Sequence, residues 1–116
     1  MLSYSGVLPI VYHPDYMAPL RPSHRFPMSK YGYLREALVA RGVLPVGGGF
    51  VSPKAASEAA LGLAHDPGYV ARVLTQSLDA AEVRRIGLPA TERMARRSCL
   101  SAAGTTLAAW IAIETG

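Results

Sequence analysis

The order of elements in this 116-residue sequence predicts an α/β fold in which about two parallel strands are flanked by helices. Two short apolar runs have the length of buried strands, and apolar residues recur at helical spacing between them and after them. A helix that connects two strands favours a parallel arrangement of those strands. Two strands are too few for a finished parallel sheet, so we expect the sheet to be incomplete.

The first third of the chain is expected to contain a strand, a long loop and a helix. Residues 7–12 (VLPIVY) are apolar and β-branched, and the HPD sequence after them ends the predicted strand. Residues 17–27 hold three prolines and form the predicted loop. Apolar residues then recur three and four apart from Tyr31 to Leu38, which predicts a helix that ends before Gly42.

The middle of the chain is expected to hold a connection and the second strand. Residues 43–53 contain three glycines and two prolines, which is typical of a connection. Their glycine triplet, 47–49, has neither the Lys-Ser/Thr of a P-loop nor the spacing of a dinucleotide-binding fingerprint, so we interpret it as a flexible link. Ser57 is placed to cap a short helical turn, and residues 61–65 (LGLAH) form the second predicted strand.

Capping signals in the last half of the chain predict two helices and, between them, a short turn that ends near Gly87. Asp66 before a proline is a good helix start, and an Asp79–Glu82 pair has the spacing of a capping box. Thr91 or a neighbour is expected to cap the last and longest helix. The apolar positions of that helix follow a period of 3.6 residues: Leu100, Ala103, Leu107 and Ile111.

Composition favours one small cytoplasmic domain. The chain is 50% hydrophobic with a net charge of +4, which argues against intrinsic disorder. Its single cysteine, Cys99, cannot form an intramolecular disulfide and gives no sign of an oxidising compartment. No apolar run has the length of a membrane span, and no signal peptide is evident. The basic residues are scattered, so we do not expect a nucleic-acid partner.

The residues alone indicate no complete catalytic or metal site. His13 and His65 lie at the ends of predicted strands, where a structural role is the simpler interpretation. His24 lies in the proline-rich loop and is the most plausible functional histidine. Cys99 falls within an apolar helix and is expected to be packed and inert. We therefore expect no catalytic residue, no metal ligand and no cofactor in this chain.

Five segments in register resemble a known family. They are LPIVYHPDY (8–16), HRFPMSKY (24–31), HDPGYV (65–70), RIGLPAT (85–91) and AAGTTLAAWIAIETG (102–116). Their order is similar to that at the N-terminus of histone deacetylase-like proteins, in the bacterial branch near the class IV enzymes. The resemblance implies a partial arginase/deacetylase-like fold. Residues 1–116 would then be the N-terminal segment of a single deacetylase-like domain without its metal-binding C-terminal part.

That resemblance also implies a site. Family members are zinc-dependent hydrolases that cleave amides of acylated lysine or related amines, and zinc is expected only in the full-length domain. The positions that match the family's substrate channel are Tyr12, His24, Arg25, Phe26 and Lys30. Arg96 stands near a position where some members have an acidic residue, and Ala90 stands where the bacterial branch would have Trp. The acylated substrate would be bound only if the missing part completed the site.

Three functions follow from these observations. The first is a scaffold and substrate-channel segment of a zinc-dependent deacetylase, inactive alone. The second is a non-catalytic interaction module that oligomerises or binds a partner chain, because an incomplete sheet and a long helix would leave apolar surface exposed. The third is a small basic nucleic-acid-binding protein.

Overall fold

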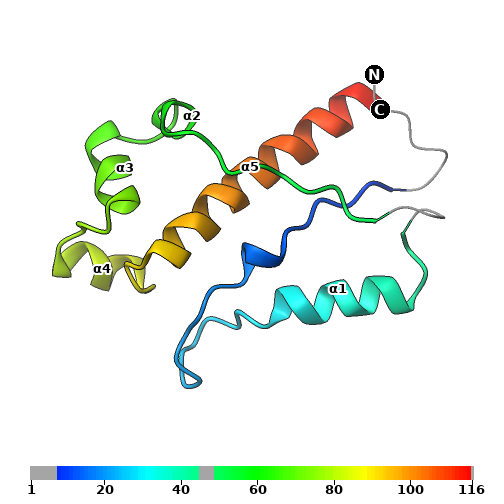
Figure 1. Ribbon diagram of the computed structural model, residues 1–116, viewed down its shortest axis with the longest axis horizontal. Helices are drawn as coiled ribbons and strands as arrows, with labels where there is room; N and C mark the ends of the chain where they lie inside the picture. The colour runs from blue at the N-terminus through cyan, green and yellow to red at the C-terminus, as the bar shows by residue number, and fades with distance from the viewer. Residues whose placement is uncertain (1–7, 45–48, 116) are drawn as a thin grey trace.

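The computed structural model describes residues 8–44 and 49–115, which form an open arrangement of helices around one long helix (Figure 1). The elements in chain order are η1 (Pro14–Tyr16), α1 (Lys30–Ala40), α2 (Glu58–Gly62), α3 (Pro67–Leu74), α4 (Ala80–Ile86) and α5 (Glu92–Thr115). Helix α5 runs diagonally through the molecule and contacts both η1 and α3. None of the helices in the described part is both long and apolar enough to cross a bilayer.

The predicted α/β fold with a parallel sheet is wrong, because the described residues contain no strand. Residues 8–12 pair with the chain near Val51 through one isolated parallel bridge, formed by Val11 and Val51. Two backbone hydrogen bonds hold it: Tyr12 N–H donates to the Val51 carbonyl and Val51 N–H to the Ile10 carbonyl, each at 2.9 Å. The bridge does not extend into a ladder. Val7 and residues 45–48, including the start of the glycine triplet, lie outside the described residues.

The second predicted strand, residues 61–65, is also wrong, because its first two residues belong to α2. The hydroxyl of Ser57 accepts a hydrogen bond from Ala60 N–H at 3.1 Å, which starts a helical turn. An apolar run this short fits a helix as well as a strand, and the preceding alanines favour the helix.

The predicted helix caps are confirmed. Ser57, Asp66 and Asp79 each accept a backbone N–H three residues ahead, and Asp79 with Glu82 forms a full capping box. Thr91 Oγ1 likewise accepts from Met94 N–H at 3.1 Å at the start of α5. Each cap satisfies a donor that the first turn of a helix leaves free.

The helix that follows the proline-rich loop is confirmed, but its apolar residues are only partly covered. Helix α1 is followed by Gly42, whose φ of 66° is the left-handed conformation that glycine adopts easily. None of its residues is buried, and Tyr33, Leu34 and Val39 are 67%, 57% and 47% exposed. Figure 1 shows α1, in cyan, lying apart from the other helices.

The molecule is one layer thick. Its principal extents are 48 × 34 × 17 Å, and the shortest leaves little room for a second layer beside helices about 10–12 Å across. The radius of gyration is 16.2 Å, against about 13 Å for a compact domain of this length. The accessible surface is 7886 Å², against about 6,100 Å² for a compact monomer of this mass.

What core there is lies along α5. The buried apolar residues are Ala18, Met28, Val70, Met94, Ala95, Cys99, Leu100 and Ile111. Ala18, Met28 and Met94 form one cluster, against which Leu20, Phe26 and Leu88 pack. The proline-rich loop is thus fixed to the first turn of α5 by apolar contact.

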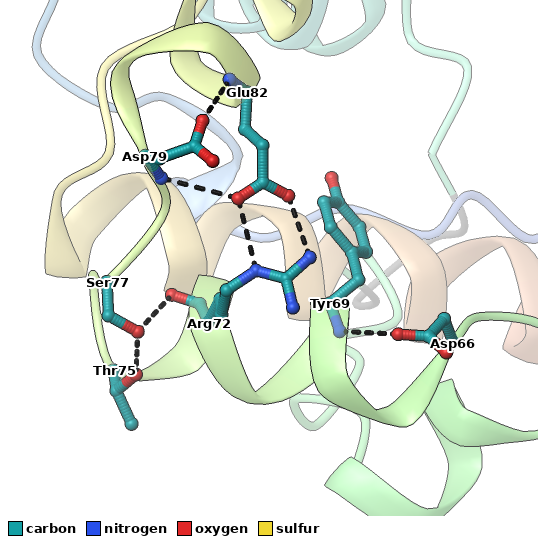
Figure 2. A network of polar contacts seen from close by, with 7 residues as sticks. All are labelled: Asp66, Tyr69, Arg72, Thr75, Ser77, Asp79 and Glu82. Carbon is teal, nitrogen blue, oxygen red and sulfur yellow. Dashed lines mark hydrogen bonds and ion pairs between the residues drawn. The ribbon is translucent and has the colours of Figure 1, made fainter.

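An ion pair joins α3 to α4 (Figure 2). The guanidinium of Arg72 donates two hydrogen bonds to the carboxylate of Glu82, from Nε at 3.1 Å and from Nη2 at 2.8 Å. The same carboxylate accepts from Asp79 N–H at 3.3 Å. Glu82 is only 9% exposed, and a buried carboxylate needs hydrogen-bond donors. The two N–H groups of Arg72 and the backbone N–H of Asp79 supply them.

Candidate functional site

Five aromatic rings from distant parts of the chain gather beside α5. We call them the aromatic cluster: Tyr12, Tyr16, Phe26, Tyr31 and Phe50. Tyr12 lies 5.1 Å from Phe50 and 6.0 Å from Tyr16, between ring centroids, and Tyr16 lies 6.2 Å from Tyr31. The Val11–Val51 bridge brings Tyr12 and Phe50 together, and η1 turns the chain so that Tyr16 faces α1.

Three cations lie on the faces of these rings. The guanidinium carbon of Arg97 is 5.2 Å from the Phe26 centroid and 5.3 Å from that of Tyr31. Lys30 Nζ approaches the same two rings at 5.0 and 5.2 Å. Arg35 lies over Tyr12 and Phe50 at 5.7 and 5.4 Å. Such contacts contribute about 0.5–1 kcal/mol each where the cation is exposed and more where it is desolvated.

Arg97 is the buried member of this set, with 9% of its surface exposed. Its Nε donates to the carbonyl of Tyr16 at 2.8 Å, and its Nη2 donates to the hydroxyl of Tyr31 at 2.9 Å. These bonds and the two stacked rings fix the plane of the guanidinium. Arg97 therefore connects η1, the proline-rich loop and α1 to the long helix.

Asp15 binds the other two arginines of the α5 start. Its carboxylate accepts from Arg96 Nε at 2.8 Å and from Arg93 Nη2 at 3.5 Å. The hydrogen bond from Arg96 is the main reason that the pKa of Asp15 lies below its ordinary value, and the charge of Arg93 adds to the effect. His13 caps this turn, because its Nδ1 accepts from Asp15 N–H at 2.9 Å. Its structural role is thus confirmed.

The structure brings three of the five predicted channel residues together. Tyr12, Phe26 and Lys30 belong to the aromatic cluster or contact it. Arg25 is exposed. His24 lies elsewhere in the loop and is bonded on both ring nitrogens. A role for these residues in binding a substrate stays a prediction.

The hydrogen bonds of His24 define its tautomer. Its Nδ1 accepts from Phe26 N–H at 3.0 Å, and its Nε2 lies 2.8 Å from the carbonyl oxygen of Gly87. A carbonyl only accepts, so we assign the proton to Nε2. In this arrangement the imidazole ties the proline-rich loop to the end of α4.

The central residue of the cluster, Arg97, was not among the predicted channel residues. The available signal was its position on the apolar stripe of α5, three residues after Met94 and three before Leu100, both of which are buried. A charged residue on a buried stripe must find hydrogen-bond partners.

A groove lies between the N-terminal extended segment and α5, with a volume of about 440 Å³. We call it the Arg97 groove; its lining is Leu8, Pro9, Ile10, Val11, Tyr16, Tyr31, Arg97, Ser101, Gly104, Thr105 and Ala108. The Tyr16 ring enters it so closely that its hydroxyl lies against Gly104, where a side chain would collide with it. Burial raises the pKa of the Tyr16 phenol.

A second hollow between α3 and α5, of about 160 Å³, contains Cys99. The thiol is buried, and this burial raises its pKa, which is the opposite of what a nucleophilic cysteine needs. No group of three or more His, Cys, Asp and Glu is close enough to hold a metal ion within residues 8–44 and 49–115. The zinc implied by the deacetylase resemblance therefore has no ligand set in the described residues.

Comparisons with known proteins do not identify a family. No family model matches the chain. An uncharacterized protein of the cyanobacterium Picosynechococcus sp. is 38% identical over 108 residues, which are 93% of this chain and 36% of that protein. The chain thus spans about a third of the length of the curated relative that it matches. That relative carries no functional description in its name.

The identification as a histone deacetylase-like protein is therefore wrong. An arginase-like fold needs a large parallel sheet, and the described residues contain helices, loops and one isolated bridge but no strand. Neither the family models nor the curated relative indicates a deacetylase or another hydrolase.

Proposed function

We propose that this chain is a non-catalytic interaction module, whose open layer is covered by a partner polypeptide or by a second copy. The observation that carries the proposal is the 17 Å thickness of the molecule. A stable domain normally packs two layers around a common core. Here the helices lie side by side around α5, and a covering chain would supply the second layer.

Exposed apolar side chains support this proposal at two places. On α1, Tyr33 and Leu34 are more than half exposed. On the last turns of α5, Trp110 is 58% exposed and Ile113 is 74% exposed. Large apolar residues clustered on one element are characteristic of surfaces that are covered in an assembly.

The amount of surface is also consistent with an interface. The chain exposes about 1,800 Å² more than a compact monomer of its mass. A stable protein–protein interface of standard size buries about 800 Å² on each partner, so this excess is more than one such interface needs.

A non-catalytic role agrees with what the charged and imidazole groups do. Glu82 is bound by Arg72, Asp15 by Arg96, and His24 by backbone groups on both sides. Each of these groups holds two elements together. A cytoplasmic location belongs to the same proposal and is supported by the single, buried Cys99.

Light scattering of the chain, from low micromolar to near-millimolar concentration, tests this proposal. We expect the mean mass to rise with concentration, because the chain alone can cover its apolar surface only with further copies. Leu34→Glu places a charge among the exposed apolar residues of α1, and Ile113→Glu does the same on the last turns of α5. Each substitution should lower the association. Ala112→Glu is the matched control, since it adds the same charge to an exposed site beside Ile113. A monomer at all concentrations, with a cooperative unfolding transition, would contradict the proposal.

A further inference from the structure

We infer that the Arg97 groove binds a polypeptide segment that carries one carboxylate side chain among apolar ones, with Arg97 as the anchor for the carboxylate. This inference rests on the proposed interaction role, because it states the chemistry of the partner at one place on the covered surface. Three features support it: the positive charge of the groove, the unused N–H donors of Arg97, and the shape of the groove.

The charge of the groove has one sign. Arg97 is the one charged residue among the described residues that line it. The carboxylate of Asp15, in η1, is bound by Arg96 and Arg93 and not by Arg97. Lys30 lies on the same two rings as Arg97 and adds a second positive charge nearby. A buried cation without a counterion favours an anionic partner.

Arg97 also has donors to offer. A guanidinium carries five N–H donors, and two of those on Arg97 are used by the Tyr16 carbonyl and the Tyr31 hydroxyl. The remaining three have no acceptor among the described residues. Because Phe26 and Tyr31 hold the plane of the guanidinium, little further ordering is needed when a carboxylate approaches.

The shape of the groove favours a peptide over a phosphate group. Its volume of about 440 Å³ is within the range of sites that bury several side chains. One wall is apolar and runs from Leu8 to Val11. The opposite wall, on α5, carries the small residues Ser101, Gly104 and Ala108, whose short side chains leave the groove open. A phosphate group or a nucleic acid would need several cations and an open polar surface. A single fixed arginine between apolar walls suits a Glu or Asp side chain with apolar neighbours.

Two capped peptides test the inference: acetyl-Leu-Glu-Val-amide and its Gln counterpart. Binding is followed by NMR through the Nε–H resonance of Arg97. We expect the Glu peptide to shift this resonance and to bind about tenfold more tightly than the Gln peptide, since the charge-assisted hydrogen bonds exist only with the carboxylate. The difference should shrink at high salt.

Three variants make the test specific. Arg97→Met removes the cation and should abolish the preference for the Glu peptide, with binding followed through the resonances of the peptide. Ala108→Leu fills the groove from an exposed helix position and should weaken both peptides while leaving the Arg97 contacts intact. Arg84→Gln, on the exposed side of α4, is the control for loss of one positive charge and should change nothing.

Equal binding of the Glu and Gln peptides would overturn the inference, and so would no binding of either. Failure of the carboxylate site can be told apart from failure of the interaction role, because light scattering measures the self-association of the chain without any peptide. A chain that associates with itself but ignores the Glu peptide would keep the proposed function and refute the carboxylate site.

Discussion

The Nη2 atom of Arg97 donates a hydrogen bond to the hydroxyl of Tyr31 at 2.9 Å, which joins α5 to α1 across 66 residues of sequence. The Tyr31 ring also lies beneath the same guanidinium. Since α1 has no buried residue of its own, this contact is one of the few that fix its position. Several of the following predictions concern groups that meet at this point.

Removing the Tyr31 hydroxyl should cost little, and removing Arg97 should cost more. Tyr31→Phe keeps the ring and loses one hydrogen bond, so we expect a loss of about 0.5–1.5 kcal/mol in the free energy of unfolding. Arg97→Met also leaves the Tyr16 carbonyl without its donor, which adds about 1–3 kcal/mol. Urea unfolding followed by circular dichroism measures both. An equal effect of the two substitutions would show that Arg97 acts only through Tyr31.

Gly104→Ala should destabilise the protein although alanine is the better helix former by about 1 kcal/mol. A methyl group at this position would collide with the Tyr16 hydroxyl and would lie 3.1 Å from its Cζ. The ring must therefore move out of the groove. Tyr16→Phe removes the colliding atom, so the double variant should recover part of the loss in a double-mutant cycle. Additive effects would refute the close approach.

The Arg72–Glu82 pair should make stability depend on acid pH. The hydrogen bonds from Arg72 are the main reason that the pKa of Glu82 lies below its ordinary value of 4.5. A depressed folded-state pKa means that the stabilisation is complete above the unfolded-state pKa and is lost as the pH falls through the folded-state pKa. Thermal unfolding between pH 6 and about pH 3 measures this.

The matched variants for that measurement are Glu82→Gln and Glu36→Gln. Glu82→Gln should lower the melting temperature at neutral pH and flatten its decline in acid. Glu36 is exposed on α1, so its amide should leave the pH profile unchanged. A Glu82→Gln profile parallel to that of the wild type would contradict the assignment.

Cys99 should react slowly with thiol reagents in the folded state. Burial both restricts access to the sulfur and raises the pKa of the thiol, and only the thiolate attacks. We expect iodoacetamide labelling to accelerate strongly in urea, with a midpoint that coincides with that of the helical signal. Rapid labelling under native conditions would show that α3 does not cover α5 in solution.

The helix boundaries were the predictable part of this fold. Ser57, Asp66, Asp79 and Thr91 each begin a helix because a short polar side chain satisfies a local backbone donor. That interaction depends on three or four consecutive residues and can be read from sequence.

The predicted strands were wrong because strand formation depends on residues that are distant in the sequence. Residues 7–12 and 61–65 are short apolar runs, and whether such a run pairs in a sheet depends on partners elsewhere. The segment at residues 61–65 follows a cap and two alanines, and it is partly helical. The deacetylase-like sheet was implied by the family resemblance, and it is corrected together with the two strands.

The aromatic cluster was predictable only in part. Tyr12, Phe26 and Lys30 were among the predicted channel residues, but the residues that join them, Tyr16 and Arg97, were not. The contacts of Arg97 span 66 and 81 residues of sequence, and no spacing rule relates positions so far apart. Only the presence of an arginine on an apolar stripe pointed to it.

Hydrogen exchange at the amides of α1 is the most direct test that this layer is covered by another polypeptide surface. Helix α1 has 11 residues, none of them fully buried, and a helix of this length is marginal in water without tertiary packing. We predict that these amides exchange almost freely in a dilute, monomeric sample and become protected when the chain associates at high concentration. Strong protection of α1 in the dilute monomer, unchanged at high concentration, would contradict the interaction role.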